Sequence, residues 1–136
     1  MKYYSTNNKE HIVNAKEAVL AGLAPDGGLY MPEEIPKLSA DEIAGLSEKS
    51  FHELAFLLSN PFLKEDVTED VLKGIIEDAF NFEVPLVELE PGISVLELFH
   101  GPTFAFKDFA ARFMARLMAY FKGQDCLLYT SPSPRD

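Results

Sequence analysis

One lysine, Lys107, lies in a segment whose residue types are suited to carbonyl chemistry. The decapeptide Phe99–Asp108 (FHGPTFAFKD) surrounds this amine with aromatic residues where a strand is expected to give way to a helix. A lysine amine attacks a carbonyl carbon only in its neutral form, and burial among apolar side chains disfavours the ammonium. Phe104, Phe106 and Phe109 are candidates to exclude water from it or to serve as ordinary core. The spacing alone fits both a Schiff-base lysine and a solvated lysine in the first turn of a helix.

The neighbours of Lys107 act on its charge in opposite directions. The positive end of the helix dipole opposes an ammonium at a helix start, whereas the adjacent carboxylate of Asp108 favours one. His100 has a hydroxyl neighbour in Thr103, but the segment offers no third member of a nucleophilic triad. The sequence leaves the balance of these effects open.

The first half of the chain is predicted to be mostly helical. Capping boxes at Asn14, Ser39 and Ser50 predict helices over residues 15–21, 40–46 and 51–58, and Pro61 is expected to end the third. His52 falls within that third helix, where a packed or surface role is expected rather than a catalytic one.

A fourth helix and a short strand complete the expectations for this half. Thr68 is expected to cap a helix with apolar residues at 3.6-residue spacing, and Val67 is expected to pack on Leu72. A brief strand is predicted over Leu29–Met31, after the Pro25–Gly28 turn and before Pro32.

The second half begins with alternating apolar residues, which are typical of strands. Residues 85–89 and 93–98 flank a Pro-Gly turn and predict a hairpin. A long helix is then predicted over residues 107–121, with an apolar stripe typical of core packing: Phe109, Phe113, Leu117, Met118 and Phe121.

Composition argues against several classes of function. The chain has 136 residues, with 22 acidic and 12 basic residues and a net charge of −10, which disfavours binding to a phosphate backbone. Nucleic acid is therefore not an expected partner. A single cysteine, Cys126, and three dispersed histidines predict neither an internal disulfide nor a metal site. No apolar leader or membrane-spanning stretch is evident, so a cytoplasmic protein without a membrane partner is expected.

Two separated strings resemble one enzyme family. FHGPTFAFKDFAARFMA resembles the lysine segment of the threonine synthase family, whose members use pyridoxal phosphate (PLP). MKYYSTN and AVLAGLAPDGGLYMPEEIP resemble the start of the same family, in the same order. The resemblance runs from Met1 to about Lys122 but covers only the N-terminal part of a family member. The chain looks like a fragment of an enzyme.

This resemblance implies a fold, a cofactor and a reaction. The fold is the α/β type II PLP fold, of which this chain would contain the mostly helical N-terminal region, the first strands and the lysine-bearing helix. Lys107 would be both the catalytic and the cofactor-binding residue, joined to pyridoxal 5'-phosphate as a Schiff base. PLP acts as an electron sink. The small-molecule substrate would be O-phospho-L-homoserine, which reacts with water to give L-threonine and phosphate.

The resemblance also divides the chain into three parts. Residues 1–83 would form the N-terminal helical region, and residues 84–125 would begin the cofactor-binding α/β domain. Residues 126–136 depart from the family: they contain two prolines and no glycine where the resemblance implies a loop of backbone amides for the cofactor phosphate. We expect this tail to be foreign or truncated and disordered, and the chain to be inactive alone.

Two alternatives remain at this point. Other type II PLP enzymes, such as amino-acid dehydratases and cysteine synthases, usually place Ser-x before their lysine, whereas Ala105-Phe106 precedes Lys107. A non-enzymatic acidic helical interaction module is the second alternative. The sequence indicates no oligomeric state.

Overall fold

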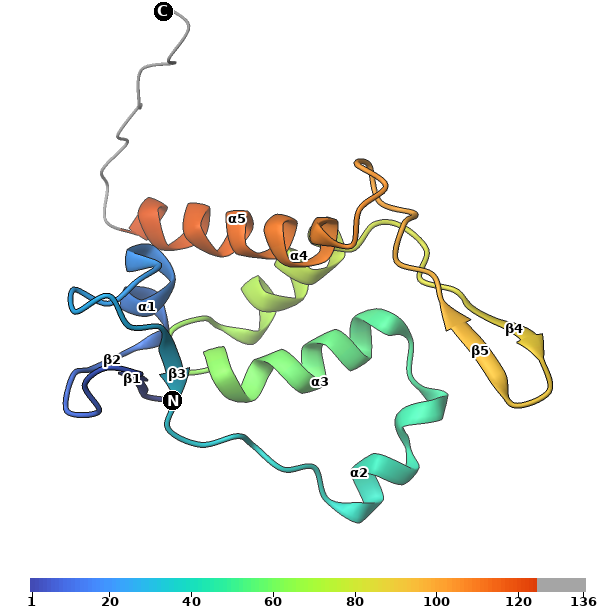
Figure 1. The fold of residues 1–136 in the computed structure, drawn as a ribbon, viewed down its shortest axis with the longest axis horizontal. Helices are drawn as coiled ribbons and strands as arrows, with labels where there is room; N and C mark the ends of the chain where they lie inside the picture. The colour runs from blue at the N-terminus through green and yellow to red at the C-terminus, as the bar shows by residue number, and fades with distance from the viewer. Residues whose placement is uncertain (125–136) are drawn as a thin grey trace, which may run out of the picture.

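The computed structural model describes residues 1–124, so Cys126 and the predictions for the tail at 126–136 lie outside the described residues. Figure 1 shows a group of helices with a small sheet at one end and a hairpin at the other. The mixture of helices and short strands agrees with the expected mostly helical N-terminal region.

A three-stranded antiparallel sheet gathers the N-terminal residues. It contains β1 (Tyr3–Ser5), β2 (Ile12–Val13) and β3 (Tyr30–Pro32) in the order β2-β1-β3. The sequence predicted only β3, which here includes Pro32 rather than ending before it. The other two strands are only three and two residues long, too short for an alternating pattern to be visible.

Local capping fixes the starts of three helices. The capping boxes at Asn14, Ser39 and Ser50 are all present and open α1 (Ala15–Ala21), α2 (Ala40–Ala44) and α3 (Phe51–Leu63). The expected helix over 40–46 ends early, and a 3₁₀ turn, η1 (Leu46–Glu48), follows it.

Two details of the predicted helices were wrong. Pro61 does not end α3, which continues to Leu63 although Pro61 lacks the N–H that would bond to the carbonyl of residue 57. Buried Leu63 packs in the core, and the Tyr3 hydroxyl donates to the Phe62 carbonyl oxygen at 3.0 Å, so tertiary contacts hold this last turn. Thr68 stands at the start of α4 (Glu69–Ala79), but its side chain makes no capping hydrogen bond.

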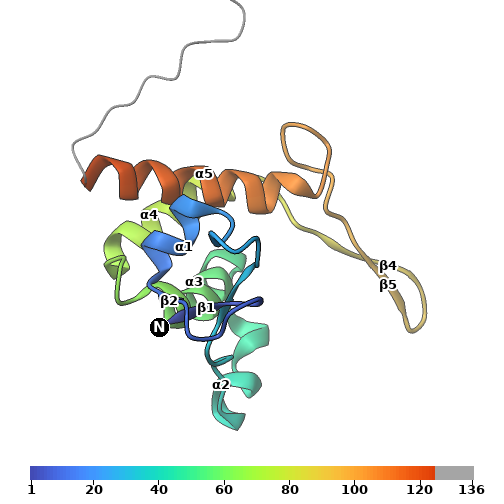
Figure 2. The same cartoon turned by 60° about the vertical axis from the view of Figure 1, so that its left-hand side comes forward.

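The core joins both halves of the chain. Val67 and Leu72 are buried together, as predicted, and Leu117 and Phe121 of α5 (Lys107–Gln124) enter the same cluster. Helix α5 packs against α1 and α4, and α3 packs against α4. In Figures 1 and 2, α5 lies along one side of the other helices. The helix that carries Lys107 is thus anchored in the core of the N-terminal region.

The predicted hairpin is present and projects from this body. Strands β4 (Leu86–Glu90) and β5 (Ile93–Leu96) pair antiparallel, with a register irregularity between Glu88 and Glu90. Every residue of both strands is exposed. Figures 1 and 2 show the hairpin extending away from the helices. Its apolar side chains therefore have no cover within the described part of the chain.

Candidate functional site

Lys107 is the first residue of α5, as predicted, and it follows a loop that begins at Gly101. The sequence left the burial of this lysine open, and within the described structure Lys107 is exposed. Within residues 1–124, only the preceding loop and the first turns of α5 lie around it.

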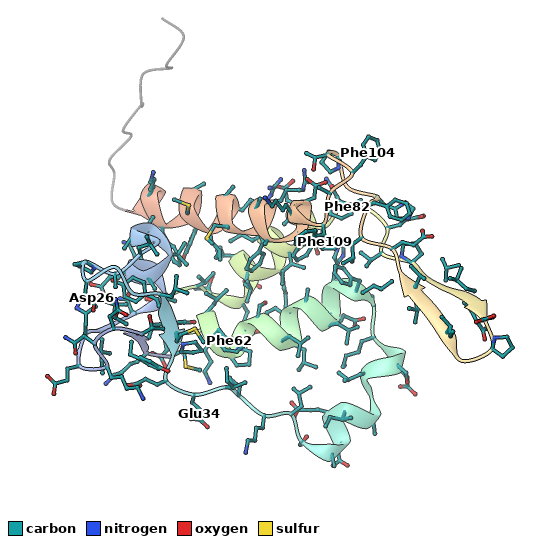
Figure 3. All side chains as sticks on the ribbon, viewed as in Figure 1. Asp26, Glu34, Phe62, Phe82, Phe104 and Phe109 are labelled. Atoms are coloured by element: carbon teal, nitrogen blue, oxygen red, sulfur yellow. The ribbon has the colours of Figure 1, made fainter. Side chains whose placement is uncertain are left out.

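The aromatic residues near Lys107 have different roles. Phe104 and Phe106 are 79% and 67% exposed, so neither is a core residue. Phe109 is partly buried, with ring centroids 5.1 Å from Phe82 and 5.9 Å from Phe80. In Figure 3, Phe104 lies at the outer end of the loop, whereas Phe82 and Phe109 lie close together at the start of α5. Of the three candidates, Phe109 is the one that packs in a cluster of aromatic rings.

A shallow apolar hollow lies beside the lysine. Its volume is about 480 Å³, and it runs along one face of α5; its lining includes Phe106, Lys107, Ala110, Met114 and Met118. The exposed primary amine of Lys107 is among the groups that line this hollow. An amine next to an apolar surface suits a carbonyl compound with a flat ring, so the residues present fit the lysine-holding part of a PLP site.

The carboxylate of Asp108 organises the loop before Lys107. Asp108 is 5% exposed, and its two oxygens accept hydrogen bonds from the Thr103 backbone N–H at 2.9 Å and from the Thr103 hydroxyl at 2.8 Å. A Cβ added to Gly101 would lie 2.4 Å from Asp108 Oδ2, so only glycine fits beside this carboxylate. The sequence analysis treated Asp108 only as a charge beside Lys107 and missed this contact.

Phe104 gives this loop an unusual backbone. Its φ is +57°, and it is the one non-glycine residue among residues 1–124 with a positive φ. Its N–H donates to the Gly101 carbonyl at 3.1 Å, and the Asp108 N–H donates to the Ala105 carbonyl at 3.0 Å. The loop is therefore closed by its own hydrogen bonds in a conformation that a non-glycine residue rarely adopts.

The histidines are placed away from any triad. His100 Nε2 lies 2.6 Å from Glu97 Oε2, and its ring stacks on Phe99 with centroids 4.6 Å apart. His52 Nε2 lies 2.8 Å from the Phe80 carbonyl oxygen, a partly buried contact that confirms the packed role expected for His52. The sequence did not predict the pairing of His100 with Glu97.

A second polar cluster surrounds the turn at Asp26. Fully buried Ser5 donates its hydroxyl to Asp26 Oδ1 at 2.7 Å, and the Gly28 N–H donates to the same oxygen at 2.9 Å. The hydrogen bond from Ser5, followed by that from Gly28, lowers the pKa of the Asp26 carboxyl. Figure 3 places Asp26 at the end of the molecule opposite Phe104, so this cluster holds the small sheet and not the lysine loop.

Among residues 1–124, no group of three or more His, Cys, Asp or Glu side chains is arranged to hold a metal ion. No helix in this range is both long enough and apolar enough to cross a membrane.

Comparison with known proteins identifies the class of enzyme to which this lysine segment and helical region correspond. A family model described as "Threonine synthase N terminus" matches residues 2–80, more than half of the chain. The chain belongs to the threonine synthase family.

Individual relatives extend the match beyond this model. Threonine synthase of Pseudomonas aeruginosa is 42% identical over 123 residues, covering 87% of this chain and 26% of that protein. Threonine synthase of Schizosaccharomyces pombe is 40% identical over 127 residues, covering 89% of this chain and 25% of that protein. The aligned share is large enough that it must extend past Lys107.

Solved structures resemble the fold as well. A crystal structure of PLP-bound threonine synthase from Brucella melitensis superposes with a TM-score of 0.87 at 40% identity, covering 92% of this chain and 28% of that one. A crystal structure of threonine synthase from yeast gives a TM-score of 0.85 at 34% identity, and the match covers 27% of that chain. This chain spans about a quarter of the length of the relatives that it matches.

Proposed function

We propose that this chain is the lysine-bearing N-terminal part of a threonine synthase. The complete enzyme converts O-phospho-L-homoserine and water to L-threonine and inorganic phosphate. The observation that carries the proposal is the position of Lys107, an accessible amine beside an apolar hollow at the start of α5, within a chain 42% identical to a threonine synthase.

The cofactor we propose is pyridoxal 5'-phosphate, with Lys107 as its attachment residue. When bound, PLP would supply an electron sink for the electron pair that remains when a proton is removed from the carbon next to the amino-acid nitrogen. The threonine synthase of Brucella melitensis, whose structure resembles this chain, was solved with PLP bound, which supports the choice of cofactor. Phe106, Ala110 and Met114 would offer the apolar side of the site and exclude water from the amine.

The remaining parts of the site belong to residues beyond α5. We infer a type II PLP fold, in which residues 84–125 begin the cofactor-binding domain and the phosphate-binding loop follows. The exposed apolar strands of the hairpin support a larger functional unit: Leu86 is 68% exposed and Leu89 is 67% exposed. The cytoplasmic location stays a prediction.

A chimera tests this proposal. Residues 1–122 of this chain would be followed by the part of Pseudomonas aeruginosa threonine synthase that lies beyond the aligned region. We expect the chimera to bind PLP, to become labelled at Lys107 after borohydride reduction, and to release phosphate from O-phospho-L-homoserine with formation of threonine.

Matched lysine variants make the chimera decisive. Lys107→Ala should remove both the reducible cofactor bond and threonine formation, whereas Lys122→Ala should leave both nearly unchanged, because Lys122 lies exposed in the last turn of α5. A Lys107→Ala chimera with normal threonine production and a reducible bond at another lysine would refute the assignment.

A further inference from the structure

Asp108 is a nearly buried carboxylate next to the proposed cofactor lysine, and no step of the proposed reaction uses it. At 5% exposure it would be unfavourable to bury without partners, and Thr103 supplies two, at 2.9 Å from its N–H and 2.8 Å from its hydroxyl. Both partners precede Lys107 in the chain, while the carboxylate follows it. The two hydrogen bonds therefore join the residues before and after Lys107 and close residues 103–108 into a loop that contains it.

We propose that Asp108 is a positioning residue that fixes the direction in which Lys107 leaves the start of α5, by locking Thr103 and the loop that precedes the lysine. This inference rests on the proposed function of Lys107. Asp108 is not offered as a catalytic residue, because its oxygens are used by Thr103 and its side chain is buried.

Two further features of the loop agree with this role. Gly101 leaves room for the carboxylate, since a Cβ there would lie 2.7 Å from Asp108 Cβ. Phe104 keeps a positive φ although its side chain is 79% exposed and gains little from packing. A residue keeps a strained backbone conformation only where its surroundings hold it there. Here the hydrogen bonds between Asp108 and Thr103 hold the loop and so keep Phe104 at its positive φ.

Locking the loop has a defined chemical consequence. The Lys107 side chain is long and exposed, so the direction of its Cα–Cβ bond is the main constraint that the described residues place on its amine. A displacement of about 1 Å in a reacting group can cost about 100-fold in rate. Loss of the lock should therefore slow attachment of PLP to Lys107 and lower kcat more than it raises KM for O-phospho-L-homoserine.

The test uses the chimera and four substitutions. Asp108→Ala removes both hydrogen bonds, and Thr103→Val removes only the one from the hydroxyl. Asp108→Asn keeps both contacts, because its amide oxygen can accept from the Thr103 N–H and its amide nitrogen can donate to the Thr103 hydroxyl. Asp78→Ala is the matched control. It removes an exposed carboxylate of α4 that pairs with Arg116, a residue of α5 that lies away from the loop.

The readouts are the rate of borohydride-trapped PLP attachment at Lys107, located by peptide mapping, together with kcat and KM. Amide exchange of Thr103 reports the lock itself. We expect Asp108→Ala to slow attachment and lower kcat by about 10- to 100-fold, Thr103→Val to act in the same direction by less, and Asp108→Asn and Asp78→Ala to stay within about threefold of the parent.

Each other outcome counts against a specific claim. If Asp108→Ala behaves like Asp78→Ala, or if Asp108→Asn is as impaired as Asp108→Ala, positioning by Thr103 is refuted while the role of Lys107 stands. If Asp108→Ala fails to fold, Thr103→Val decides, because Thr103 is exposed and lies outside the core cluster; unchanged attachment in that variant refutes the lock. A Lys107→Ala chimera that still forms threonine refutes the proposed function instead.

Discussion

Arg112 Nε lies 2.8 Å from the Ala79 carbonyl oxygen and so ties the helix of Lys107 to the C-terminal end of α4. The same guanidinium donates through Nη2 to the Asp78 carbonyl at 3.0 Å and to Asn81 Oδ1 at 2.9 Å. The last carbonyls of a helix lack partners within the helix, so Arg112 caps α4 from outside. Arg112 thus provides hydrogen-bond donors for carbonyls at the end of α4 and anchors the first half of α5 to that end.

Replacing Arg112 by methionine should lower the free energy of unfolding by about 2–3 kcal/mol, because each lost hydrogen bond contributes about 0.5–1.5 kcal/mol. Urea unfolding of the 136-residue chain measures this. Arg116→Met is the control: Arg116 pairs with the exposed carboxylate of Asp78, a type of pair that contributes at most about 1 kcal/mol. Equal effects of the two substitutions would contradict the capping role of Arg112.

Replacing Gly101 by alanine should lower the free energy of unfolding by roughly 1–3 kcal/mol, because the new Cβ would meet Asp108 and force the loop to shift. Gly74→Ala provides the opposite expectation. Gly74 lies exposed in α4 with nothing within 4 Å of its Cβ position, so alanine should stabilise the chain by about 0.5–1 kcal/mol. Chemical denaturation measures the free energy of unfolding of both variants. A Gly101→Ala variant as stable as the parent would contradict the close contact between position 101 and Asp108.

Tyr3 should make the stability of the chain sensitive to high pH. Burial raises the pKa of the Tyr3 hydroxyl above its ordinary value of 10.0, and the carboxylates of Asp66 and Glu65 add to the shift. The folded state therefore holds this proton more tightly than the unfolded state, so the contribution is complete below pH 10 and is lost as the pH rises through the folded-state pKa.

Tyr3→Phe separates this contribution from general alkaline unfolding. The variant should lose about 1 kcal/mol at neutral pH with the hydrogen bond to the Phe62 carbonyl, and its stability should fall less steeply than that of the parent above pH 10. Urea unfolding at a series of pH values gives both quantities. Identical slopes in parent and variant would rule out Tyr3 as the source.

The 136-residue chain alone should not convert O-phospho-L-homoserine. The described residues supply the amine of Lys107 and one apolar face, but the inferred phosphate loop lies beyond α5. Phosphate release and threonine formation by the purified chain measure this, with the chimera as the positive control. Turnover above the uncatalysed rate would contradict the prediction.

Local sequence predicted what local contacts determine. The capping boxes at Asn14, Ser39 and Ser50 use groups within three residues of each other, and all three are present. The start of α5 at Lys107 was also predicted, because its apolar stripe continues without interruption for several turns.

The errors arose where distant contacts decide. Pro61 was expected to end α3, yet the bond from Tyr3 to Phe62 and the burial of Leu63 hold another turn. The burial of Lys107 could not be predicted either, because it depends on what covers the hollow along α5, and the adjacent residues do not provide that cover. The Thr103–Asp108 contact was missed because it depends on the path of the intervening loop, which apolar spacing does not specify.

The burial of Leu117 and Phe121 among α1, α3 and α4 also bears on biosynthesis. A polypeptide leaves the ribosome N-terminus first, and its early segments fold before later ones exist. Helix α5 can dock on a core made entirely of preceding sequence, so Lys107 can be positioned as soon as residues 1–124 have been translated. Residues 1–124 leave the apolar strands β4 and β5 uncovered, so a nascent chain at this stage presents strand edges that are prone to aggregation.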